Sequence, residues 1–126
     1  MDCKRPPDNP MKAVIRSLTT SDGIDLRNVT VADPSDFELY VRIIAGPDNG
    51  PGEESFDFTL LTPVALARRL RDVGMVVGRF LIFVDHFDAL PVREMLERLV
   101  TSCEGPDWPA VGNQLAAIAC WEFQGY

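Results

Sequence analysis

Residues 52–63 constrain the fold of this chain more than any other stretch. After a Gly/Pro-rich turn, apolar and polar side chains alternate on opposite faces: Phe56, Phe58 and Leu60 against Ser55, Asp57 and Thr59. A period of two is typical of a strand with one buried face. Thr62 can cap a following helix, and Pro63 can occupy its first position. We therefore predict a strand over 54–61 and a helix over 63–73, with Gly74 as its C-cap.

Three further segments predict strands, over residues 12–18, 37–45 and 79–84. Residues 79–84 are apolar on both faces, which favours a central strand covered on two sides. The polar segment between residues 19 and 36 predicts a long loop. The last eight residues alternate like a short strand but also fit the end of a helix.

Helical periodicity predicts two more helices. Apolar residues at positions 92, 95, 96, 99, 100 and 103 form one stripe and predict a helix over 89–103. Asp107 can cap another helix over 108–118. In the helix over 63–73, an apolar stripe is expected to face the core and three arginines to form a solvated face: Leu66, Ala67, Leu70 and Val73 against Arg68, Arg69 and Arg71.

These elements predict an α+β domain, an antiparallel sheet of about four strands packed against about three helices. At 126 residues, the chain suits a single domain over residues 11–126. Residues 1–10 include three prolines and are expected to form a flexible arm. The expected core includes six large side chains: Val41, Phe56, Phe58, Ile82, Leu96 and Leu99.

Charge and composition limit the classes of partner. A formal net charge of −7 disfavours nucleic-acid binding, because phosphates would repel the chain, and favours a basic protein partner. No apolar run approaches the roughly 18 residues that span a bilayer, and the N-terminus lacks the apolar stretch of a secretory signal. We therefore expect a cytoplasmic protein without membrane association.

The cysteines and the histidine indicate little chemistry. The three cysteines are widely spaced, which disfavours disulfides or structural zinc, and Cys103 and Cys120 are expected to be small buried hydrophobes. His86 is the only histidine, between Asp85 and Asp88. It fits either an acid–base or metal residue or an ordinary loop histidine, and the lack of helical i, i+4 metal spacing favours the loop.

Catalytic motifs are absent from the sequence. It contains no nucleophile elbow, phosphate-cradling glycine loop or dinucleotide fingerprint. Glu53 and Glu54 are adjacent on a strand and should point to opposite faces, so they cannot easily share a site. We therefore predict no catalytic residues, cofactor or metal. A small enzyme that uses His86 with a neighbouring carboxylate stays as an alternative.

Several short motifs occur in a characteristic order. They are Met11-Lys12-Ala13, Gly52-Glu53-Glu54-Ser55-Phe56, Thr62-Pro63, Gly78-Arg79, and Trp121-Glu122-Phe123 followed by Tyr126. Together these motifs resemble the immunity protein 8 family of bacterial polymorphic toxin systems, over residues 11–126. The chain departs from the family pattern at Leu61, often cysteine, at Ala65, where an aromatic residue is expected, and at Gly125, which replaces an acidic residue.

The resemblance implies a non-enzymatic protein that binds and neutralises a cognate toxin domain in the producing bacterial cell. Partners of such families are frequently nucleases, so a basic nuclease is a candidate. The alternative to both this role and the enzyme is a regulatory or structural subunit without a toxin partner. The motif residues are expected to determine the fold, whereas exposed acidic residues would determine toxin specificity.

The second half of the chain is dense in acidic residues. We expect six of them to form part of a negative surface that faces a basic toxin: Asp85, Asp88, Glu94, Glu97, Glu104 and Asp107. The alternative is that they are ordinary solubilising charge. The acidic segment 48–57 is the next candidate for the toxin-binding surface.

Overall fold

The computed structural model describes residues 10–122. The predicted arm therefore lies outside the described residues apart from Pro10. Within this range the chain forms a six-stranded mixed sheet, three α-helices and one 3-10 helix. The strands are β1 (Met11–Thr20), β2 (Glu38–Pro47), β3 (Glu54–Leu61), β4 (Leu81–Phe83), β5 (Glu104–Gly105) and β6 (Cys120–Trp121). The helices are η1 (Leu26–Asn28), α1 (Pro63–Val73), α2 (Ala89–Thr101) and α3 (Trp108–Leu115).

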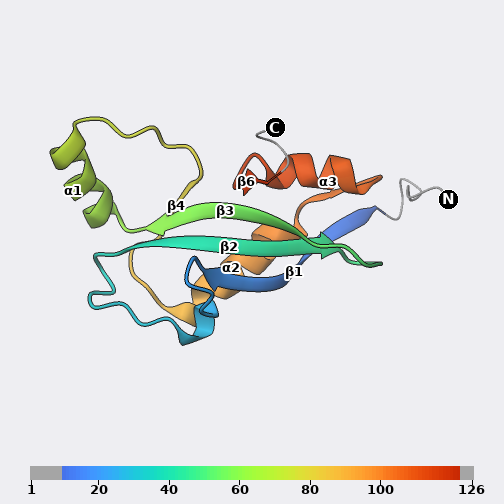
Figure 1. The fold of residues 1–126 in the computed structure, drawn as a ribbon, viewed down its shortest axis with the longest axis horizontal. Coiled ribbons are helices and arrows are strands. Elements are labelled where there is room, and N and C mark those ends of the chain that lie inside the picture. Colours follow the sequence, from blue (N-terminus) through green and yellow to red (C-terminus); the bar gives the residue numbers. More distant parts are fainter. Residues whose placement is uncertain (1–9, 123–126) are drawn as a thin grey trace.

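The sheet has the order β4-β3-β2-β1-β5, and β6 pairs with β3 outside this path. Strands β1, β2 and β3 form an antiparallel meander that makes up most of the sheet (Figure 1). The α+β class is confirmed. The C-terminal alternation forms the short strand β6, which runs antiparallel to β3.

The prediction of a wholly antiparallel sheet is wrong at β4, which runs parallel to β3. The reason is the helix that starts at Thr62-Pro63. Because α1 and the segment after it carry the chain back along the sheet, the next strand enters in the same direction as β3. Parallel neighbours need such a crossover, whereas a short hairpin would have given an antiparallel pair.

The central position predicted for residues 79–84 is also wrong. Strand β4 contains only three residues and lies at the edge of the sheet. Phe83 is 49% exposed and Ile82 is only partly buried, although Ile82 was expected in the core. The segment is apolar on both of its faces, but the rest of the structure does not cover both faces.

Helix α2 closes the core by packing against β1. Val92, Leu96 and Val100 are buried at helical spacing and join the apolar face of the sheet. Four of the expected core residues are confirmed as buried: Val41, Phe56, Phe58 and Leu96. Leu99 is only partly buried because the inward stripe of α2 follows positions 92, 96 and 100.

The two cysteines differ in burial. Cys103 is buried as predicted, but Cys120 is exposed, so the second prediction is wrong. Cys120 precedes Trp121 in β6, and consecutive residues of a strand point to opposite sides. The indole of Trp121 packs against the core, which leaves the thiol of Cys120 outside.

Local sequence signals set both ends of α1. Thr62 is fully buried, and its hydroxyl accepts hydrogen bonds from the backbone of Ala65 and Phe37, both at 3.3 Å. Gly74 has φ 80° and donates to the carbonyl of Leu70 at 2.7 Å, as a left-handed C-cap does. Asp107 caps α3 as predicted, although that helix ends at Leu115 rather than 118.

The packing of α2 predicts unequal costs for two leucine truncations. Leu96→Ala should lower the free energy of unfolding by about 2–5 kcal/mol, because the side chain is fully enclosed. Leu99→Ala, one turn away and only partly buried, should cost clearly less. Urea denaturation of both variants measures the difference. Equal losses would contradict an inward stripe at positions 92, 96 and 100.

Candidate functional site

Two of the sequence motifs, Gly52–Phe56 and Trp121-Glu122, meet at the first half of β3. Strand β6 pairs antiparallel there, with Phe56 opposite Trp121. The two rings are stacked, with centroids 5.7 Å apart and planes inclined by 22°. The indole Nε1 donates a hydrogen bond to the carboxylate of Glu54. The backbone N–H of Ser55 donates to Glu122 Oε1 at 3.1 Å. These contacts fasten residues 120–122 to β3.

Glycines allow the close approaches that this arrangement needs. A Cβ at Gly112 of α3 would lie 2.7 Å from the ring of Trp121, so only glycine leaves room for the indole. A Cβ at Gly46 would lie 2.0 Å from the carbonyl oxygen of Gly52, whose φ is 123°. Both features give the motif residues structural roles, at the β2–β3 turn and at β6. Phe123 and Tyr126, also motif residues, lie outside the described residues.

The six acidic residues occupy different surroundings. Asp85 and Asp88 share a hollow of about 240 Å³ between β4 and the start of α2, which we call the acidic hollow. Its lining consists of Phe83, Val84, Asp85, His86, Asp88, Pro91, Val92 and Met95. The apolar floor includes Phe83 and Met95, each 49% exposed. An apolar floor beside carboxylates suits the aliphatic stem and charged head of lysine or arginine.

The two carboxylates of the acidic hollow are open to solvent in different ways. The side chain of Asp85 is 90% exposed, and its Oδ1 lies 3.0 Å from Nδ1 of His86. The hydrogen bond with His86 lowers the pKa of Asp85. Asp88 is the N-cap residue of α2, but its side chain makes no capping hydrogen bond. Neither carboxylate is used to hold a helix end.

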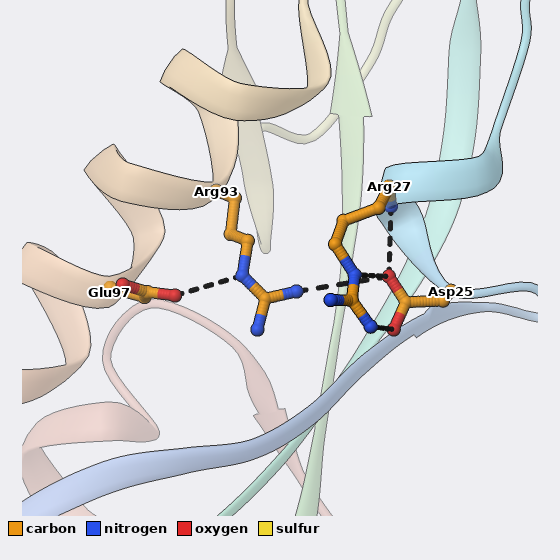
Figure 2. A network of polar contacts seen from close by, with 4 residues as sticks. All are labelled: Asp25, Arg27, Arg93 and Glu97. Carbon is orange, nitrogen blue, oxygen red and sulfur yellow. Dashed lines mark hydrogen bonds and ion pairs between the residues drawn. The ribbon is translucent and has the colours of Figure 1, made fainter.

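Glu97 belongs instead to a polar network that joins η1 to α2 (Figure 2). Arg93 Nε donates to Glu97 Oε1 at 2.9 Å, and Arg93 Nη1 lies 3.8 Å from Asp25 Oδ1. Asp25 in turn accepts hydrogen bonds from the backbone and the guanidinium of Arg27. Those hydrogen bonds lower the pKa of Asp25.

The remaining three acidic residues lie outside the acidic hollow. Glu94 is exposed on α2. Glu104 Oε2 lies 3.9 Å from Lys12 Nζ, and Asp107 accepts a hydrogen bond from the backbone of Ala110 at the start of α3. The structure therefore brings Asp85 and Asp88 together. Glu97, Glu104 and Asp107 each have a partner within the chain.

Exposed apolar side chains on α1 and just after it are a feature that sequence reasoning missed. They are Val64, Leu70 and Val73 of the helix, and Met75 and Val77 beyond its C-cap. In Figure 1 the helix stands at the end of the sheet, apart from α2 and α3. Its only buried residue is Ala65. The prediction that the stripe with Leu70 and Val73 faces the core is therefore wrong.

The arginines of α1 explain this orientation. Arg68 makes a bidentate ion pair with Asp36, and Arg69 Nη1 lies 3.5 Å from Glu38 Oε1. Because these two pairs hold the polar side of the helix against the segment that enters β2, the apolar side faces away. A signal existed in the sequence, since Met75 and Val77 continue the apolar character beyond the C-cap.

A family model described as immunity protein 8 matches residues 13–126, nearly the whole chain. The chain belongs to the immunity protein 8 family. Searches of the curated proteins and of the solved structures found no match. Membership in the immunity protein 8 family implies a toxin-neutralising role and suggests a protein that is not an enzyme. Among residues 10–122, no helix is long and apolar enough to cross a membrane.

The network around Asp25 predicts a pH-dependent contribution to stability. Because the folded state lowers the pKa of Asp25, its charged form stabilises the fold above the unfolded value near 3.9, and this contribution disappears as the pH falls through the folded value. Asp25→Asn should cost up to about 1 kcal/mol at neutral pH and progressively less in acid. Urea denaturation from pH 7 to pH 2, with Asp22→Asn as control, measures it. A loss that stays constant across this range would contradict the role of the charge.

Proposed function

We propose that this protein is a non-enzymatic immunity protein that neutralises a cognate toxin domain by binding it directly in the bacterial cytoplasm. The observation that carries the proposal is the match of residues 13–126 to the immunity protein 8 family. A direct complex is the simplest means by which a protein of 126 residues can block a toxin stoichiometrically.

The charge of the chain supports a basic partner. The net charge is −7, and a nuclease, which must attract phosphates, presents a basic surface. Attraction between oppositely charged surfaces raises the rate of encounter. Asp85, Asp88, Glu94 and Asp107 would contribute most to this long-range field. Glu97 and Glu104 would contribute less, because Arg93 and Lys12 compensate their charges.

The acidic hollow is the part of this surface best suited to short-range contact. Phe83 and Met95 offer apolar area to an inserted side chain, and Asp85 and Asp88 offer charge to its head. Contacts of this kind, an anchor in a pocket with a polar rim, carry most of the energy of protein interfaces. We therefore propose a lysine or arginine of the toxin as the anchor.

The enzymatic alternative based on His86 finds little support in the geometry. The side chains of His86 and Asp85 are 57% and 90% exposed, so water surrounds the pair. An acid–base group is normally tuned by burial and held against a bound substrate. At this position the pair suits a partner's cation better than a reaction.

Inhibition by binding predicts a stoichiometric titration. The protein, mixed with its cognate toxin domain, should abolish toxin activity linearly and completely at an equimolar ratio. The two should also elute together in size-exclusion chromatography. An enzyme that modified the toxin or its target would act at far lower ratios. Loss of toxin activity at such ratios, without a complex, would overturn the proposal.

The position of the interface is tested by removing charge without disturbing the fold. Asp85→Asn with Asp88→Asn should lower the association rate about tenfold at low salt and flatten its salt dependence. Asparagine also suits an N-cap, so α2 should stay intact. The control, Asp22→Asn with Asp72→Asn, removes the same charge elsewhere. Stopped-flow measurements at two salt concentrations compare the variants.

A third variant distinguishes long-range electrostatic attraction from short-range contact with the toxin. Met95→Ala should raise the dissociation rate and leave the salt dependence unchanged, because the side chain carries no charge. If the double asparagine variant and Met95→Ala both bind like the original protein, the acidic hollow does not contact the toxin. The acidic segment 48–57 would then be the surface to test.

A further inference from the structure

A second, larger hollow lies on the other face of the sheet, with a volume of about 470 Å³. Val41 and Phe58 point into the core that α2 closes, so the residues that alternate with them point away from it. Three of these side chains lie opposite one another on neighbouring strands, in the order Thr19, Arg42 and Asp57. Residues 79 and 80 form one wall. We call this feature the sheet hollow.

The wall of the sheet hollow contains a strained residue. Phe80 has φ 59°, the only positive φ of a non-glycine residue in the described part of the chain. A bulky side chain in this conformation is strained, and such strain concentrates at binding sites. The carbonyl of Phe80 accepts a hydrogen bond from Thr59 at 2.9 Å, which fixes the strained residue to β3.

The strained conformation places an arginine beside an aromatic ring. The guanidinium carbon of Arg79 lies 4.8 Å from the centroid of the Phe80 ring, within the range of a cation–π contact. Arg79 is exposed and forms no ion pair with any carboxylate among residues 10–122. Its charge is therefore available to a ligand.

The other charges of the sheet hollow cancel. Arg42 donates two hydrogen bonds to Asp57, at 2.8 and 2.9 Å, so this pair is neutral and already satisfied. The lining therefore carries one uncompensated positive charge, on a chain whose net charge is −7. Tyr40, which is 58% exposed, adds a second ring. A volume of this size falls within the range of small-ligand sites.

We propose that the sheet hollow binds a single carboxylate carried on an apolar or aromatic group. Arg79 pairs with the carboxylate, and the rings of Phe80 and Tyr40 contact the apolar part. A second negative charge is disfavoured because Arg42 is occupied by Asp57. The carboxylate comes either from a free organic acid or from an acidic side chain of the toxin domain. The site itself does not depend on the proposed function.

Benzoate is a suitable probe, and benzamide is its neutral counterpart. Benzoate should shift the backbone amide resonances of Thr59 and Phe80 saturably, with a dissociation constant in the millimolar range that small fragments reach. Arg79→Gln should weaken binding about tenfold, because a charged hydrogen-bond donor is lost. Arg71→Gln, which changes an exposed arginine outside the sheet hollow, is the matched control and should leave binding unchanged.

Phe80→Gly provides a second, independent variant. Glycine adopts a positive φ without strain, so the backbone should be retained while the ring is lost. Benzoate binding should then weaken although Arg79 is present. The proposal is overturned if benzoate causes no saturable shift up to about 50 mM, if benzamide binds equally, or if Arg79→Gln has no effect.

The toxin complex then distinguishes the two sources of the carboxylate. If the toxin supplies it, toxin binding should displace benzoate, and Arg79→Gln should weaken the complex about tenfold. If a free acid is the ligand, benzoate and toxin should bind together, and Arg79→Gln should leave toxin affinity unchanged. Benzoate binding by the isolated protein is measured without the toxin, so failure of the toxin proposal would leave this result intact.

Discussion

The fold depends on strand β3, which shares hydrogen bonds with three other strands. Its one edge pairs with β2 along the whole length, and its other edge is divided between β6 near the start and β4 near the end. The stacked rings of Phe56 and Trp121 stabilise the pairing of β3 with β6. The buried cap Thr62 fixes the end of β3 next to β4. Segments from the middle and the end of the chain therefore meet on one strand.

Features set by neighbouring residues could be predicted from the sequence, and features set by distant contacts could not. Thr62, Pro63 and Gly74 gave both ends of α1, because caps act within a few residues. The direction of β4 depends on where the chain returns after α1, which no local pattern encodes. The orientation of α1 was missed for the same reason, since ion pairs to Asp36 and Glu38 decide it.

The candidate sites show the same limit. Composition alone suggested a negative surface, and its members could be named from the sequence. Periodicity could not show that Glu97 joins a network with Arg93 and Asp25, because Asp25 is distant in the chain. Nor could it show that Asp85 and Asp88 share a hollow with Met95. The positive φ of Phe80 has no signal in the sequence, since phenylalanine gives no reason to expect it.

The outward face of α1 separates stability from recognition. Val73 at the end of α1 and Met75 just after it are 65% and 76% exposed, and they add little to the free energy of unfolding because little of their apolar area is buried. Substitutions there would change the shape of the surface and alter the free energy of unfolding only slightly. A chain built in this way can acquire a new surface through successive single replacements, each of which still folds. Its capacity to diversify is therefore concentrated in one helix and kept apart from the core.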